Sequence, residues 1–79
     1  MYSMNKQTIK RVKEISYTTS LNSPASYNTI AIKHTANTFR VYEDLTDHTY
    51  ICSIGELRDD IMNPGYGCEV KINYIVWNE

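Results

Sequence analysis

One segment of the sequence carries a full set of helix signals, and the segments on both sides of it have the pattern of strands. Ser53 and Glu56 form a capping box, in which each side chain can bond to the backbone amide of the other residue. Ile54, Leu57 and Ile61 then fall on one face of a helix, and an Asn-Pro-Gly sequence ends it. A helix of about two and a half turns is unstable alone in water, so this helix must pack on a sheet.

Five other stretches favour strands, because they alternate between apolar and polar residues or are rich in β-branched and aromatic residues. They cover residues 8–20, 27–34, 38–43, 48–53 and 68–77. In the first stretch a helical spacing competes with the strand pattern before Glu14, and a bulge near Lys13 and Glu14 would reset the alternation. Residues 1–7 are predicted to form a flexible arm, although a strand and a helix also remain open for this segment.

The last strand is predicted to lie inside the sheet, since about ten residues is long for an edge strand. Its even-numbered residues, from Cys68 to Val76, are expected to face the helix. The opposite face of the sheet is expected to be polar and aromatic, with Tyr27, Lys33, Arg40, Tyr42 and Lys71. The whole chain, residues 1–79, is thus predicted to be a single small α+β domain. It has an antiparallel sheet of four to five strands and one short helix packed on one face, in the order β-β-β-β-α-β.

The length of 79 residues limits the stability that the core can supply. A chain of this size obtains roughly 3–5 kcal/mol from its core, and two cysteines do not make a dense disulfide framework. A homodimer, a host partner and a marginally stable monomer are all compatible with this limit. No stretch of about 18 apolar residues occurs, and the first residues lack the apolar segment of a signal peptide. A cytoplasmic protein without a membrane partner is therefore expected.

The residues that could carry chemistry do not fall into a catalytic or metal-binding pattern. The soft metal ligands do not form a pair at the spacing of structural zinc sites; they are His34, His48, Cys52 and Cys68. The two cysteines could lie on neighbouring strands and form a disulfide, but free thiols are expected in a reducing cytosol. No nucleophile elbow and no glycine-rich phosphate loop occurs. The sequence therefore predicts a non-enzymatic protein with no metal and no cofactor.

Charge is distributed unevenly along a chain whose net charge is −1. Residues 1–14 contain four Lys and Arg and one Glu, whereas residues 43–60 contain six Asp and Glu and one Arg. The basic segment and the seven tyrosines would suit a small nucleic-acid-associated regulator, which is the alternative function. The isoelectric point of about 6.1 makes direct nucleic-acid binding the weaker hypothesis, since dedicated binders are usually strongly basic. The acidic residues could instead meet a basic protein surface.

The composition also points to an origin. Ile, Asn, Tyr and Lys have AT-rich codons and make up 28 of the 79 residues, which suits a low-GC bacterium or a phage. In size and composition the chain is similar to small phage inhibitors of host defence, anti-CRISPR proteins among them. No stretch matches a family motif, so no functional residue is carried over.

The leading hypothesis is a small protein–protein interaction module. It would inhibit a host protein or ribonucleoprotein complex by direct binding and occlusion, because the sequence offers aromatic and charged anchors but no chemistry. The candidate partner-binding residues are Arg40, Tyr42, Asp59, Asp60, Tyr66 and Trp77.

Overall fold

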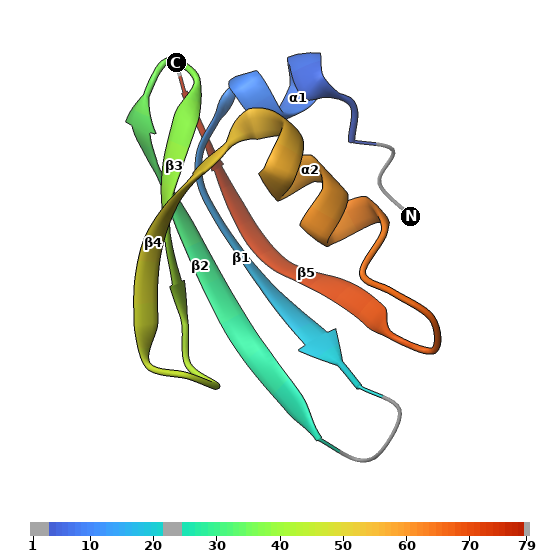
Figure 1. Cartoon of the computed structure of the whole chain (residues 1–79). Coiled ribbons are helices and arrows are strands. Elements are labelled where there is room, and N and C mark those ends of the chain that lie inside the picture. Colours follow the sequence, from blue (N-terminus) through green and yellow to red (C-terminus); the bar gives the residue numbers. More distant parts are fainter. Residues whose placement is uncertain (1–3, 22–24, 79) are drawn as a thin grey trace.

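A computed structural model describes residues 4–21 and 25–78, which form two layers (Figure 1). The elements are α1 Lys6–Lys10, β1 Val12–Ser20, β2 Ser26–Thr35, β3 Thr38–Glu43, β4 His48–Ser53, α2 Ile54–Met62 and β5 Glu69–Trp77. The five strands make one antiparallel sheet, and both helices lie on the same face of it. The predicted α+β class and the order of its main elements are confirmed, with α1 as an addition. No helix in the described residues is long and apolar enough to cross a membrane.

The strands are ordered β4-β3-β2-β1-β5 in the sheet. β1 to β4 form a meander in which consecutive strands are neighbours, and β5 returns to pair with the remaining side of β1. The prediction that the last strand lies inside the sheet is wrong. The meander already occupies one side of β1, so β5 takes the other side and becomes an edge in spite of its length.

Helix α2 begins where its capping box predicts. The Ser53 hydroxyl accepts a hydrogen bond from the Glu56 amide at 3.1 Å, and the Ser53 amide donates to the Glu56 carboxylate at 2.8 Å. Ile54, Leu57 and Ile61 are buried in the core. The cap fixes where the helix starts, and the apolar stripe fixes which side of it faces the sheet.

The segment before β1 is ordered from residue 4 onwards. Met4 is 1% exposed and Ile9 is fully buried, so both belong to the core. The Asn5 side chain caps α1 by accepting a hydrogen bond from the Thr8 amide at 2.9 Å. The prediction of a flexible arm is therefore wrong for residues 4–7, because a five-residue helix becomes stable when it packs against a core. Residues 1–3 lie outside the described part of the chain.

β1 is irregular at two places. It starts at Val12 and not at residue 8, since the preceding residues are helical. Its pairing with β5 shifts register between Val12 and Glu14, which confirms the predicted bulge. A second shift, between Ser16 and Tyr17, was not predicted.

The second register shift reverses the faces of β5 halfway along the strand. Val70, Ile72 and Ile75 pack against the core, although Ile75 is odd-numbered. Tyr74 and Val76 are exposed on the other face of the sheet. The prediction that all even-numbered residues face the helices is therefore right for Val70 and Ile72 and wrong for Tyr74 and Val76.

β2 directs its small residues to the helices and its large aliphatic residues away from them. Thr29 and Ala31 are fully buried, whereas Ile32 is 46% exposed and Ile30 is half-buried. Small side chains allow the helical layer to approach the centre of the sheet closely, and the core there is filled by larger neighbours. Hydrophobicity alone therefore does not identify the buried face of this strand.

Two residues predicted for the opposite face lie on the helix side. Tyr27 pairs with the buried Thr19, and Lys33 pairs with the buried Phe39. The Lys33 ammonium lies 4.6 Å from the centre of the Phe39 ring and donates to the Lys10 carbonyl oxygen at 2.7 Å. The predicted positions of Tyr27 and Lys33 are wrong for the same reason: β2 faces the helices with its other set of residues.

Candidate protein-binding surfaces

A groove of about 490 Å³ lies between the end of α2 and the first half of β5. We call it the β5 groove. Its lining is mostly apolar and consists of Met4, Ile61, Met62, Pro64, Cys68, Glu69, Val70 and Ile72. Accessible apolar side chains in a hollow of this size provide a site for the apolar groups of a ligand.

β5 adds main-chain groups to this groove, because it is nine residues long and lies at the edge of the sheet. No strand in the described residues pairs with its outer side, so its outward N–H and C=O groups can bond to an added strand. Val70 and Ile72 belong to the same strand and also line the groove. A segment bound along this edge would therefore find backbone partners and an apolar hollow together.

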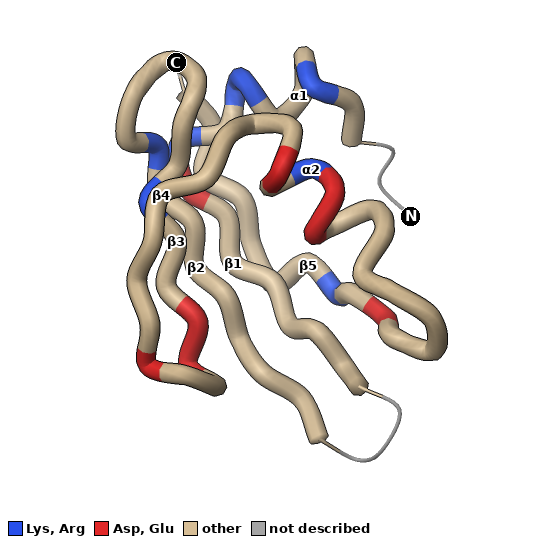
Figure 2. The backbone as a smooth tube through the Cα atoms, viewed as in Figure 1, with Lys and Arg blue, Asp and Glu red and all other residues tan. Residues whose placement is uncertain are grey.

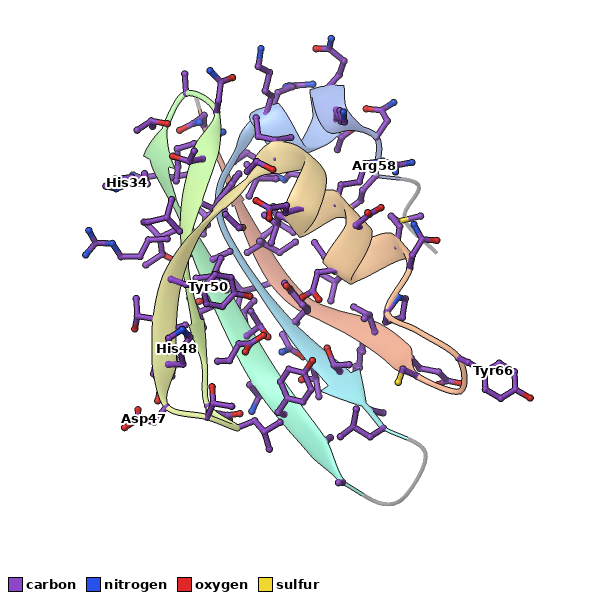
Figure 3. The ribbon with its side chains drawn as sticks, viewed as in Figure 1. His34, Asp47, His48, Tyr50, Arg58 and Tyr66 are labelled. Atoms are coloured by element: carbon purple, nitrogen blue, oxygen red, sulfur yellow. The ribbon has the colours of Figure 1, made fainter. Side chains whose placement is uncertain are left out.

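Tyr66 stands at the tip of the connection between α2 and β5. Gly65 and Gly67 on either side of it have positive φ angles of 117° and 76°, which glycine adopts without steric cost. The Cys68 amide donates to the Gly65 carbonyl oxygen at 3.1 Å and closes this turn. The Tyr66 side chain is 99% exposed and points away from the body of the molecule (Figure 3). An exposed aromatic ring is thus presented near the β5 groove.

The face of the sheet without helices, here called the open face, carries a band of exposed apolar side chains. The strand registers align one row across the whole sheet, from β4 to β5: Ile51, Arg40, Ile32, Glu14 and Val76. The three aliphatic members of this row are between 42% and 47% exposed. Isolated exposed aliphatic residues are normal, but three in one row, alternating with the charged residues Arg40 and Glu14, suit an interaction surface.

A second row lies beside the first on the open face. It consists, again from β4 to β5, of Thr49, Tyr42, Ile30, Ser16 and Tyr74. Tyr42 and Tyr74 are exposed. Beyond this row the surface becomes polar, since the Thr18 hydroxyl donates to the Asn28 side chain at 2.6 Å. The band therefore combines aliphatic, aromatic and charged side chains and has a polar border, as in protein interfaces.

Arg40 and Glu14 are the two charged residues inside the band. Ile32 lies between them in the row, so they are two strands, or about 10 Å, apart and do not pair. The Tyr74 hydroxyl donates to the Glu14 carboxylate, which raises the pKa of Tyr74. Within residues 4–21 and 25–78, Arg40 makes no side-chain hydrogen bond, so its guanidinium is available to a partner.

The residues predicted from sequence to bind a partner are spread over four regions, of which helix α2, with Asp59 and Asp60, is one. Arg40 and Tyr42 lie together on the open face, because both belong to β3 and are two residues apart. Tyr66 lies in the turn beside the β5 groove, and Trp77 is half-exposed at the end of β5. The structure therefore does not bring these residues into one site.

The two aspartates on α2 have different surroundings. Asp59 is exposed and accepts a hydrogen bond from the Asn63 side chain at 3.2 Å. Asp60 is half-buried and accepts one from the Tyr17 hydroxyl at 2.6 Å, in a small cleft between β4 and α2. Burial, and then this contact with Asp60, raises the pKa of Tyr17 well above its ordinary value. Asp60 therefore joins the helix to the sheet.

Sequence reasoning missed the residues that form most of the open face. Ile32, Ile51 and Val76 are aliphatic residues in strands; Val76 was expected to face the helix, and the other two were not assigned to a partner-binding face. For Ile51 a signal was present: it alternates with Tyr50 and Cys52, which pack on the helix side. For Val76 no local signal was available, since its direction depends on the register shift in β1.

Charged residues are unevenly distributed over the molecule, with both signs around the two helices and acidic residues at the turn between β3 and β4 (Figure 2). Lys and Arg gather near α1 and the start of β1, where Lys6, Lys10, Arg11 and Lys13 follow one another. Asp and Glu lie on α2 and at the turn between β3 and β4. Burial, and then the nearby Lys10 charge, lowers the pKa of Lys33. The residues from α1 to the start of β1 therefore form a basic surface, which lies beside the acidic residues of α2.

The remaining polar groups do not assemble into a metal site. In the described part of the chain, no group of three His, Cys, Asp or Glu residues could hold a metal ion. Cys52 and Cys68 are free thiols near opposite edges of the sheet, so the idea that they lie on neighbouring strands is wrong. Burial raises the pKa of Cys52 to about 11, which keeps this thiol protonated and unreactive at neutral pH.

Comparisons of the chain with models of protein families, with curated proteins and with solved structures gave no match.

Proposed function

We propose that this chain is a protein-binding module that captures an extended, apolar segment of a partner protein along β5. The observation that carries the proposal is the position of the β5 groove directly beside an unpaired edge strand. The outward backbone groups of β5 would bond to the segment as to a sixth strand, which supplies affinity with little dependence on sequence. The groove would supply selectivity, because alternate residues of the added strand point towards it.

The chemistry of the groove defines the segment. Its lining offers aliphatic and sulphur-containing side chains, with Glu69 as the single charged residue. Aliphatic residues at every second position of the segment would therefore fit best, and proline would be excluded because it lacks the N–H that pairing needs. Tyr66 extends the surface with an aromatic anchor of the type that often dominates binding energy.

Selection of a displayed random peptide library against the full chain tests this proposal. Enriched peptides should have aliphatic residues at alternate positions. Val70→Lys, which places a charge at the groove, should weaken an enriched peptide at least about tenfold, since an unpaired charge is costly to cover. Leu45→Lys is the matched control, because Leu45 is an exposed residue of the β3–β4 turn and its substitution should leave affinity unchanged.

Amide hydrogen exchange separates strand addition from other modes of binding. An enriched peptide should slow the exchange of amides on the outer side of β5 and leave those of β4 unchanged. Enrichment of peptides with a helical spacing of apolar residues, or protection confined to the open face, would contradict the proposal.

We propose further that the partner of this module belongs to a host defence complex, and that binding inhibits the complex. Such a module would inhibit by covering a segment that the complex needs for its own assembly or activity. The AT-rich composition and the small size support this role and a phage origin, and the two free thiols support a reducing, cytoplasmic location. This role is tested by reconstituting the host complex in which a subunit contains a segment like the enriched peptides. The activity of the complex should fall when the wild-type protein is added. It should stay unchanged when the Val70→Lys variant is added in its place.

The basic surface near α1 favours a second candidate function, the binding of a polyanion such as a nucleic acid. Several cations lie together there, and Lys33 is close enough to Lys10 for its pKa to be lowered. Binding through phosphate contacts would weaken steeply with salt, with a slope close to the number of contacts. Fluorescence anisotropy with a labelled oligonucleotide at about 50 and 200 mM salt tests it. The absence of binding at the lower concentration would exclude it.

A further inference from the structure

We propose that two copies of this chain associate through their open faces, with β2 of one copy lying over β2 of the other. The inference is independent of the proposed function, since the β5 groove and the outer edge of β5 remain accessible in each copy. It rests on the symmetry of the residues on the open face about β2 and on the area of that face.

The order of the strands makes the open face suitable for a two-fold interface. β2 is the middle strand of five, with β3 and β4 on one side and β1 and β5 on the other. A two-fold axis parallel to β2 and between the two sheets places β3 over the partner's β1, and β4 over the partner's β5. Positions along the strands are kept, so each row of side chains meets the same row of the partner.

The first row becomes complementary in charge under this operation. Arg40 on β3 meets the partner's Glu14 on β1, and the symmetry repeats this contact. Within one chain Ile32 separates these two charges, and neither forms an ion pair in the described residues. The Glu14 carboxylate accepts a hydrogen bond from the Tyr74 hydroxyl and keeps acceptor positions for a guanidinium across the interface. Ile32 meets its own copy at the axis, and Ile51 meets the partner's Val76. An unpaired cation and an unpaired anion at mirrored positions thus find each other twice.

The second row becomes complementary in size. Tyr42 on β3 meets the partner's β1 at Ser16, a small residue that is 6% exposed and accepts a hydrogen bond from the Asn73 side chain at 3.3 Å, so a large side chain lies over a small one beside Asn73. Tyr74 on β5 meets the partner's Thr49 on β4, with the same alternation. Interdigitation of large and small side chains is how two sheets pack about 10 Å apart.

The area of the open face is sufficient for a stable dimer. The chain measures 37 × 27 × 19 Å along its principal axes. The sheet itself has five strands about 4.8 Å apart and up to ten residues long, so it is about 19 Å wide and about 33 Å long. The open face therefore covers roughly 630 Å², at the lower end of the roughly 600–1,000 Å² that each partner buries in a specific interface.

Sedimentation equilibrium with the full chain tests the association. The mass should approach twice 9.2 kDa as the concentration rises through about 10–100 µM. Ile32→Asp places two carboxylates on the axis and should keep the protein monomeric over this range. Circular dichroism of each variant confirms that the exposed substitution leaves the fold intact.

A charge exchange tests the register of the interface. Arg40→Glu alone and Glu14→Arg alone each place like charges in both symmetric contacts. Each should therefore raise the dissociation constant at least about a hundredfold. An equimolar mixture of the two variants should dimerise again, because the new carboxylate at position 40 meets the new guanidinium at position 14 and the native pair forms the second contact. The chain that carries both substitutions should also dimerise.

Two results would overturn the proposal. One is a wild-type mass that stays at 9.2 kDa at all these concentrations. The other is a dimer that both single charge variants form as tightly as the wild type, which would place the interface elsewhere. Recovery of the dimer in the mixture, with neither variant dimerising alone, would support the pairing of Arg40 with Glu14.

Discussion

Tyr17 shows how a single side chain can join the two layers of this molecule. Its ring is fully buried in the sheet, and its hydroxyl donates to Asp60 on α2, 43 residues away in the sequence. A hydrogen bond to a half-buried carboxylate is stronger than one between neutral groups. No pattern near either residue predicts this pair, because the contact exists only once the helix has packed on the sheet.

We expect Tyr17→Phe to lower the free energy of unfolding by about 2 kcal/mol, since it removes a hydrogen bond to a charged group and leaves Asp60 without that donor. Urea denaturation followed by circular dichroism measures the change. Tyr66→Phe is the control, because the Tyr66 side chain is almost fully exposed and its hydroxyl has no partner in the described chain. Equal stability of Tyr17→Phe and wild type would show that the pair contributes nothing.

Single residues also show when the sequence can predict the face of the sheet on which a side chain lies. Arg40 and Tyr42 were predicted on the face opposite the helices, and they lie there because strand alternation is a local property. Tyr27 and Lys33 were predicted on that face as well, and they lie on the helix side. Their error came from β2, where Thr29 and Ala31 are buried in preference to larger residues.

At the scale of single elements, α2 depends on its first turn. The helix is nine residues long, and its start is fixed by reciprocal hydrogen bonds between Ser53 and Glu56. These bonds lower the pKa of Glu56, since they favour its charged form. The stability that the cap provides is therefore present at neutral pH and is lost as the pH falls through the lowered pKa of Glu56.

Ser53→Ala should cost about 1 kcal/mol of stability, the usual effect of removing a serine N-cap. The loss should be smaller in acid, where Glu56 is protonated and the wild-type cap is already weakened. Thermal denaturation at neutral and acidic pH tests both statements, with Ser20→Ala at the exposed end of β1 as the control. A loss that is the same at both pH values would contradict the role given to the Glu56 carboxylate.

Elements with local signals were predicted with accurate bounds. β3, β4 and the start of α2 coincide with their predicted limits, because a turn or a cap marks each of them. α1 was one of three alternatives left open for the N-terminal segment, because five residues form a helix only when Ile9 and Met4 reach the core. The edge position of β5, and hence the groove beside it, follows from the order of strands, which no local pattern contains.

At the scale of the whole molecule, the buried Cys52 thiol and Tyr17 hydroxyl predict that the folded state becomes less stable at alkaline pH. The pKa of Cys52 is raised from 9.0 to about 11 by burial, and that of Tyr17 is raised as well. Above about pH 9 the unfolded chain releases the thiol proton while the folded chain retains it. The unfolded state then binds fewer protons, so the free energy of unfolding must fall as pH rises towards 11.

Urea midpoints at pH 8 and pH 10.5 measure this loss. We expect a lower midpoint at pH 10.5 for the wild type and a smaller decrease for Cys52→Ala, which has no thiol to titrate. Comparison of each variant with itself at the two pH values removes the cost of the small cavity left by the substitution. A decrease of the same size in Cys52→Ala would show that the thiol does not contribute.

The pairing of β1 with β5 has a consequence for synthesis of the chain. Ribosomes add about 5–20 residues per second, so β1 leaves the ribosome several seconds before β5, the strand that pairs with its free edge. During that time β1 is a nine-residue edge that lacks its final neighbour. Neighbouring nascent chains on one messenger RNA can pair through this edge, and the arrival of β5 ends the exposure. Incorrect pairing between chains is therefore favoured before β5 emerges. Slow translation between residues 54 and 69 would lengthen the time during which the edge of β1 is exposed.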